Sequence, residues 1–346
     1  MEMRKRPLKA FATPEKLSQL ISNFKASDVI CDAEANANWG PAMQAQFDHI
    51  IYEKENGRVR VTLNRPDQLN PLSLQLMAEL SEAAWEADHD DDVHCLIIKG
   101  AGRAFSAGYD LTGSGSDVPV SRIQDKEANR YRGARSLDDD AWHLERAQRC
   151  RMALFDMHKP VIAQVHGYCL AGGTDLAQLC DLIIAADDAV FGFPAVRDLG
   201  APPNQMWLYN VGPQWAKRLL LTGDTITGAE AQQLGLALKA VPIEHLENEV
   251  EQLADRFAKI DHHLLSANKR IVNLGLELMG ARTLQRLAAE NDVRGHNAPG
   301  ALAFVRTMMK EGIAGALRQR KERFPDGRAR VNGPELRDAD GRLIDD

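Results

Sequence analysis

The sequence predicts an α/β protein, because short apolar runs typical of strands alternate with segments of helical period. Residues 58–64 alternate apolar and polar side chains, whereas three other runs are predominantly apolar: residues 95–98, 161–165 and 182–185. Residues 73–85 carry apolar side chains at helical spacing, and residues 172–179 open a helix after a double glycine. From about residue 214 the chain is largely helical.

Composition bounds the class of protein. The chain has 346 residues, of which 44% are hydrophobic, enough to bury a sizeable core without metals or disulfides. Its 42 Lys and Arg against 49 Asp and Glu give a net charge of −7, which argues against a nucleic-acid partner. No stretch approaches the roughly 20 apolar residues of a membrane span, so we expect no membrane partner.

Cysteine and histidine usage points to a reducing compartment and to no metal site. The five cysteines form an odd set without a CxxC pair, and several lie in apolar runs typical of buried free thiols. The basic N-terminus is not followed by an apolar signal region, so we expect a cytoplasmic protein. His262 and His263 are adjacent and do not share a helix face, which disfavours metal binding.

Two glycine-rich segments are the strongest functional signal. Residues 100–111 follow a strand directly, and residues 166–175 lie between a strand and a helix. Glycines at strand ends let the backbone approach a ligand closely, and a helix N-terminus presents free N–H groups. Donors from two separate loops can form an oxyanion hole. Either segment alone is also compatible with a simple tight turn.

Together these segments resemble the two signature loops of the crotonase (enoyl-CoA hydratase/isomerase) superfamily. Further segments resemble that family in the same order: residues 64–72 its NRPxxxNAL segment, residues 158–167 its KPVIAAVNG strand, residues 218–224 and 229–236 the helix signature that follows, and residues 310–317 its EGIAAFL helix. The resemblance covers about residues 48–324.

The resemblance implies a spiral of ββα units with a helical C-terminal region used in trimerisation. We therefore divide the chain into a polar extension at 1–47, a spiral core at 48–260, a helical region at 261–324 and a charged tail at 325–346. Inside the core, residues 112–145 lack a core-forming period and predict a long excursion. A homotrimer or a hexamer is the assembly that the resemblance implies.

The resemblance also implies an acyl-CoA thioester as ligand, with coenzyme A present only as part of the substrate and no other cofactor. By position, the backbone N–H groups of Tyr109 and Gly172 hold the thioester oxygen and stabilise its enolate. Asp110 can equally be read as a turn or capping residue. Asp110 and eight further residues stand at positions that line the CoA and acyl groove in the family. The eight are Gln68, Leu69, Pro71, Ala107, Leu111, Gly173, Pro194 and Ala195.

The carboxylates depart from the family pattern. Asp175 stands where the family carries its first glutamate, and Ala195 stands where it carries its second acid. Alanine cannot transfer a proton, so we consider Asp198 as the substitute, with a salt bridge at a trimer contact as the other interpretation. Asp175 itself could instead be a partner of the helix dipole. Asn204 lies where some isomerases carry an acid and can orient water but cannot act as a base.

Three functions follow from these residues. The first is an enoyl-CoA hydratase-like lyase that uses Asp175 with Asp198 or an ordered water. The second is an enoyl-CoA isomerase, which needs only one acid/base group. The third is a non-catalytic acyl-CoA-binding homologue whose chemistry lapsed with Ala195.

Overall fold

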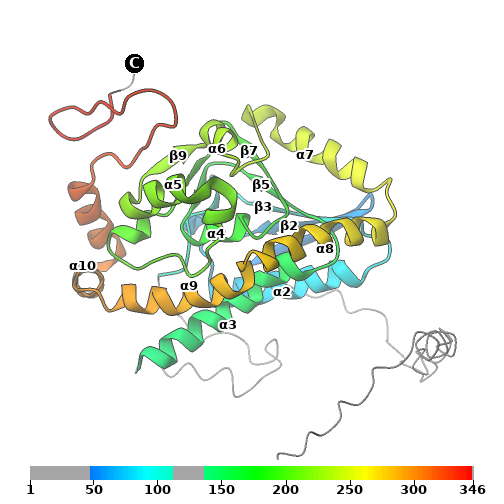
Figure 1. Cartoon of the computed structure of the whole chain (residues 1–346), viewed down its shortest axis with the longest axis horizontal. Coiled ribbons are helices and arrows are strands. Elements are labelled where there is room, and N and C mark those ends of the chain that lie inside the picture. The colour runs from blue at the N-terminus through cyan, green and yellow to red at the C-terminus, as the bar shows by residue number, and fades with distance from the viewer. Residues whose placement is uncertain (1–46, 112–135, 345–346) are drawn as a thin grey trace, which may run out of the picture. The chain divides into compact units, whose positions relative to one another are not determined.

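The computed structural model describes residues 47–111 and 136–344, which form two β-sheets covered by helices (Figure 1). Residues 1–46 of the predicted N-terminal extension lie outside the described residues, and so does the part of the predicted excursion between 112 and 135. Within the described residues, no helix is both long enough and apolar enough to span a membrane.

The larger sheet has six strands in the order β1-β2-β3-β5-β7-β10. β1 is antiparallel to β2, and every other neighbouring pair is parallel. The four strand-like runs of the sequence become β2, β3, β5 and β7, with buried aliphatic side chains at the centre of the core. The bounds are β1 Ile50–Glu55, β2 Arg58–Leu63, β3 Cys95–Gly100, β5 Val161–Val165, β7 Leu182–Ala186 and β10 Lys239–Val241.

The smaller sheet has four short strands in the order β4-β6-β8-β9, parallel except for β8 against β9. Three strands of the large sheet, β3, β5 and β7, are each followed by one strand of the small sheet and then by a helix, so the ββα unit repeats along the chain as predicted. The bounds are β4 Ala104–Ser106, β6 Tyr168–Leu170, β8 Val190–Gly192 and β9 Thr225–Thr227.

Helices cover both sheets. α2 packs against α3, α3 against α9 and α8 against α9, while α7 packs on β5 and β7 (Figure 1). The bounds are α2 Leu74–His89, α3 Leu137–Asp156, α4 Gly172–Ala177, α5 Trp207–Thr222, α6 Gly228–Leu234, α7 Ile243–Phe257, α8 His262–Leu278, α9 Ala281–His296 and α10 Pro299–Arg323; the 3-10 helices are η2 Pro66–Gln68 and η3 Pro194–Arg197.

Helix α3 corrects the prediction that residues 112–145 form an excursion throughout. The helix begins at Leu137, where the Ser136 hydroxyl accepts a hydrogen bond from the Asp139 N–H at 3.1 Å. Three consecutive acids, residues 138–140, occupy its first turn, where carboxylates stabilise the positive end of the helix dipole. The charge run that we interpreted as irregular is therefore a helix start, and the prediction is wrong from residue 137 onward.

The charged tail packs on the core through the backbone. The Thr225 N–H donates to the Gly327 carbonyl at 2.6 Å, and the Ala329 N–H donates to the Thr225 carbonyl at 2.8 Å. Ala329 is buried, and Arg218 pairs with Glu335 at 2.7 Å. The tail therefore contacts the body of the protein through backbone hydrogen bonds and through some of its charged side chains.

The C-terminal helices leave apolar side chains exposed. Leu278 at the end of α8 is 91% exposed and Met309 on α10 is 82% exposed. Surfaces of this kind are typical of protein contacts. The trimer or hexamer stays a prediction.

Candidate functional site

The two predicted glycine loops pack directly on each other. A Cβ at Gly108 would lie 2.9 Å from the Ala171 Cβ, and one at Gly172 would lie 2.8 Å from ring carbons of Tyr109. Gly108 also has φ +117°, a conformation that other residues rarely adopt. Both glycines are therefore required for the loops to approach this closely.

Two backbone N–H groups, those of Tyr109 and Gly172, lie at this contact. The Leu72 N–H donates to the Gly108 carbonyl at 2.8 Å, so the Tyr109 N–H of the same planar peptide faces away from Leu72. Gly172 is the first residue of α4, and the N–H of a first helical residue has no acceptor within its helix. Its nitrogen would lie only 3.4 Å from a Cβ on Gly108.

Ala171 holds an unusual backbone conformation, with φ 49° and ψ −118°. Such a conformation is costly for a residue with a Cβ and persists only where its surroundings impose it. The Ala171 N–H donates to the Gly192 carbonyl at 2.8 Å, and its own carbonyl accepts from the Asp175 N–H at 3.0 Å. The strain fixes how α4 begins, and no sequence pattern marked it.

Asp175 is buried on α4, and its carboxylate oxygens differ in their surroundings. Oδ2 accepts a hydrogen bond from the Tyr109 hydroxyl at 2.6 Å, whereas Oδ1 has no hydrogen-bond partner within the described residues. Burial raises the pKa of Asp175 to about 7, against the lowering influence of the Tyr109 hydroxyl and of the Arg151 charge. At neutral pH the group can therefore both take and give a proton.

Arg151 is a site component that the sequence analysis missed. It is 1% exposed, its guanidinium lies over the Tyr109 ring at 5.0 Å from the centroid, and its Nε donates to Asn204 Oδ1 at 2.8 Å. Asn204 in turn donates to Gln285 Oε1 of α9 at 3.1 Å. One sequence signal could have revealed Arg151. Gln148 and Arg151 are three residues apart and so lie on one helix face, which places two polar side chains on the buried face of α3.

Several predicted groove residues are brought together by Arg65, which the sequence analysis did not single out. Its guanidinium pairs with Asp110 at 2.6 Å, donates to Gln68 Oε1 at 2.9 Å and donates to the Pro71 carbonyl at 3.2 Å. The Ala107 N–H donates to the Leu69 carbonyl at 2.9 Å, which joins the two loops. Arg65 thus holds these two loops together.

The remaining predicted groove residues are distributed more widely. A Cβ at Gly173 would lie 2.5 Å from the Ser106 carbonyl oxygen, so Gly173 belongs to the same loop contact. Leu111 is the last described residue before residue 136. Pro194 and Ala195 form the start of η3, and Ala195 packs against the core. Their contact with a substrate stays a prediction.

Asp198 forms ion pairs with two arginines of α10. Its Oδ2 lies 2.7 Å from Arg323 Nη2, its Oδ1 pairs with Arg320, and its side chain is 1% exposed. These contacts give no support to the prediction that Asp198 supplies the second acid. They resemble the other interpretation, a salt bridge, although here both arginines belong to the same chain.

We expect Asp198→Asn to lower the free energy of unfolding by about 3 kcal/mol, because it leaves a largely buried arginine without its counter-charge. Urea denaturation at fixed protein concentration measures this change. Asp92→Asn is the control, since that carboxylate is 86% exposed in its pair with Lys54 and should change stability by less than about 0.5 kcal/mol. Equal effects of the two variants would contradict the structural role of Asp198.

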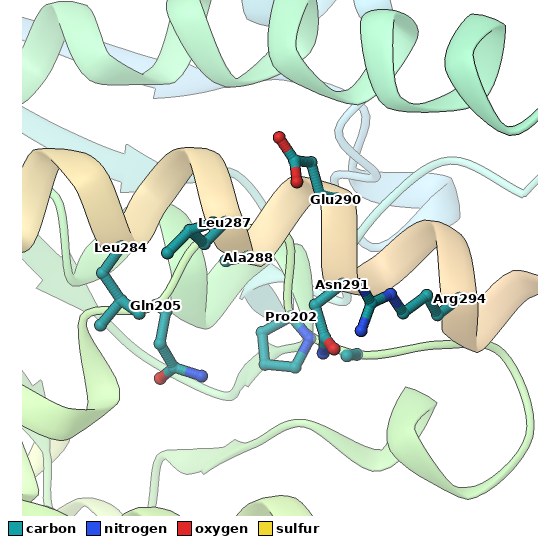
Figure 2. Close-up of a pocket in the computed structure, with 9 residues that line it drawn as sticks. Pro202, Gln205, Leu284, Leu287, Ala288, Glu290, Asn291 and Arg294 are labelled. Atoms are coloured by element: carbon teal, nitrogen blue, oxygen red, sulfur yellow. The ribbon is translucent and has the colours of Figure 1, made fainter.

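A separate pocket of about 320 Å³ lies between α9 and the segment before α5 (Figure 2). Figure 2 shows Leu284, Leu287 and Asn291 projecting from the helix near Pro202 and Gln205, with Glu290 extending from the opposite side of the helix. Asp175 is not among the residues that line it; these are Ala201, Pro202, Gln205, Leu284, Leu287, Ala288, Glu290, Asn291 and Arg294. No cluster of potential metal ligands occurs among the residues that the structure describes.

The fold and the site together define a class of protein. A buried carboxylate, Asp175, lies next to two glycine-containing loops at the ends of parallel strands, where α/β proteins commonly place their binding sites. A family profile described as enoyl-CoA hydratase/isomerase matches residues 53–311. The chain belongs to this family.

Individual relatives agree with that assignment. The chain is 36% identical over 240 residues to a probable mitochondrial enoyl-CoA hydratase of Dictyostelium discoideum, covering 67% of this chain and 78% of the relative. It is 33% identical to a crotonyl-CoA hydratase of Syntrophomonas wolfei, covering 80% and 98%. A solved enoyl-CoA hydratase of Mycobacterium smegmatis superposes with a TM-score of 0.74 at 34% identity, covering 82% and 96%. The predicted fold class and family resemblance are confirmed.

Proposed function

We propose that the protein is an enoyl-CoA hydratase-like lyase that adds water across the C2=C3 bond of an enoyl-CoA thioester. The observation that carries the proposal is the carboxylate of Asp175, buried next to the converging loops of Tyr109 and Gly172. Relatives at 33–36% identity are named as hydratases, which supports the same reaction. In this proposal, coenzyme A enters only as part of the substrate.

The reaction balances with a single carboxylate. Asp175 Oδ1 takes a proton from water while the water oxygen bonds to C3 and the C2=C3 electrons move onto the thioester oxygen. The N–H groups of Tyr109 and Gly172 stabilise this enolate. When the enolate collapses, C2 takes the proton from Asp175, which returns to its ionised form. Water is added, and no oxidant or reductant is needed.

Isomerisation is the second candidate, and one observation favours it. Ala195 occupies the position at which the family resemblance expects a second acid, and Asp198 is paired with arginines. Moving a proton from C2 to C4 of a 3-enoyl thioester needs only one acid/base group. The same Asp175 and the same N–H pair serve both reactions.

An assay on paired substrates separates the candidates. Loss of the conjugated enoyl absorbance of crotonyl-CoA, with mass-spectrometric detection of the 3-hydroxy product, supports hydration. Gain of that absorbance from a 3-enoyl-CoA, with no crotonyl-CoA turnover, would replace hydration by isomerisation. Binding of CoA esters without turnover of either substrate would contradict both enzymatic candidates.

We expect kcat/KM to rise about tenfold per pH unit below about pH 7 and to level off above it. The reason is that burial raises the pKa of Asp175 to about 7, and only the ionised carboxylate can take a proton from water. Initial rates from pH 5 to 9 measure the profile, with circular dichroism confirming that the fold persists. A rate that is flat from pH 5 to 7 would contradict Asp175 as the base.

A further inference from the structure

We propose that the side-chain hydroxyl of Tyr109, held in place by Arg151, is a positioning group that reserves Oδ1 of Asp175 for proton exchange. This inference rests on the proposed function and deepens it. Tyr109 then has two roles: its backbone N–H is one donor of the oxyanion hole in the proposed function, and its hydroxyl orients the acid/base group.

The first support is the asymmetry of the Asp175 carboxylate. The Tyr109 hydroxyl donates to Oδ2 at 2.6 Å, a short hydrogen bond of the kind formed with an ionised acceptor. Oδ1 is also buried and has no hydrogen-bond partner in the described part of the chain. A buried carboxylate oxygen without a donor is costly, so its persistence indicates a group that meets a proton or a water during the reaction.

The second support is the fixation of the Tyr109 ring. One face of the ring lies against the Cα of Gly172, where an added Cβ would be 2.8 Å away. The guanidinium of Arg151 lies over the ring at 5.0 Å from its centroid. Arg151 is itself anchored, because Nη1 donates to Met77 Sδ at 3.1 Å and Nε donates to Asn204 Oδ1 at 2.8 Å.

Four groups from different segments influence the charge of Asp175: the Tyr109 hydroxyl, Arg151, Asp292 and the backbone N–H of Asn204. Arg151 of α3 and the Tyr109 hydroxyl favour its ionised form, and so does the nearby backbone N–H of Asn204, which favours the anion without forming a hydrogen bond to Oδ1. Asp292 of α9 opposes ionisation, and burial raises its own pKa to about 6. Removing the Tyr109 hydroxyl takes away a favourable contact to the anion and leaves the opposing charge in place.

The decisive variant is Tyr109→Phe, which keeps the ring and the backbone N–H. We expect kcat to fall about tenfold or more with KM nearly unchanged, because binding groups are retained while the acid/base group loses its orientation. The acidic limb of the pH profile should move up by about one to two pH units, since the carboxylate loses a hydrogen bond to its charged form.

Tyr209→Phe is the matched control. It removes a hydroxyl that donates to the Met279 carbonyl at 3.2 Å, away from Asp175. The control should keep the wild-type kcat and pH midpoint. A Tyr109→Phe enzyme with wild-type kcat and pH profile would overturn the proposal, and so would an equal shift of the pH midpoint in both variants.

The role of Arg151 is tested through Tyr109. Arg151→Lys keeps a positive charge but loses the planar guanidinium that stacks on the ring, so we expect a kcat loss comparable to that of Tyr109→Phe. If Arg151 acts by holding the hydroxyl, the double variant should be little worse than either single variant. Multiplicative losses would show that Arg151 acts independently and would overturn this part of the proposal.

A readout without turnover separates failure of this inference from failure of the proposed function. Infrared difference spectra against Asp175→Asn report the protonation of Asp175 as pH is varied. We expect its midpoint to move upward in Tyr109→Phe whichever thioester is the substrate. An unchanged midpoint would overturn the inference, whereas an absence of hydration with a shifted midpoint would contradict only the proposed reaction.

Discussion

Asp175→Asn is expected to lower kcat for enoyl-CoA hydration by about 10²- to 10⁴-fold, the usual contribution of a general acid/base group. The amide has nearly the same shape and can still accept from the Tyr109 hydroxyl at its remaining oxygen, but it cannot take a proton from water. Steady-state rates with crotonyl-CoA measure the loss. Activity within twofold of the wild type would remove Asp175 from the mechanism.

Stability measurements supply the control for this loss. Because the folded-state pKa of Asp175 is raised to about 7, its protonated form is favoured on folding, and the associated stability is present at low pH and lost as pH rises through 7. The neutral amide escapes that loss, so the variant should be at least as stable as the wild type at pH 8. Asp188→Asn, at an exposed acid, should leave both kcat and stability unchanged.

Gly172→Ala is expected to lower kcat by about 10²- to 10³-fold, the usual cost of losing one oxyanion donor. The new Cβ would lie 2.8 Å from carbons of the Tyr109 ring, so the ring or the start of α4 must move and the two N–H groups separate. Kinetics with crotonyl-CoA and thermal unfolding measure the two consequences, with kcat affected far more than KM.

Gly275→Ala is the matched control for this substitution. Gly275 lies inside α8, and a Cβ there meets nothing within 4 Å, so the variant should keep its kcat and gain about 0.5–1 kcal/mol of stability. If Gly172→Ala behaves like the control, the close approach of the two loops has no catalytic role.

The core strands could be predicted from the sequence because a buried strand appears as a short run of apolar residues. Residues 95–98 and 161–165 are predominantly apolar runs, and they form neighbouring parallel strands. The start of α3 was missed because its first turn consists of acidic residues. They interact favourably with the helix dipole but show no hydrophobic periodicity. Periodicity detects a buried face, and a helix terminus has none.

Some residues of the candidate site have a local sequence signal and others do not. The N–H donors could be predicted because glycines at strand ends form a recognisable motif. Arg151 left almost none, since its role depends on the ring of Tyr109, 42 positions earlier in the chain and brought close only by tertiary packing. The contacts of Asp198 with Arg320 and Arg323 were likewise hidden, because they join residues separated by more than 120 positions.

The ion pair between Asp198 and α10 restricts which substitutions this sequence can accept during evolution. It ties η3, which carries the position of the absent second acid, to the end of the last helix. Asp198 and Arg320 are both largely buried, whereas Arg323 is more than half exposed, so loss of either Asp198 or Arg320 alone leaves its partner as a buried charge with less compensation. Among descendants of this sequence we therefore expect positions 198 and 320 to be inherited or lost as a pair.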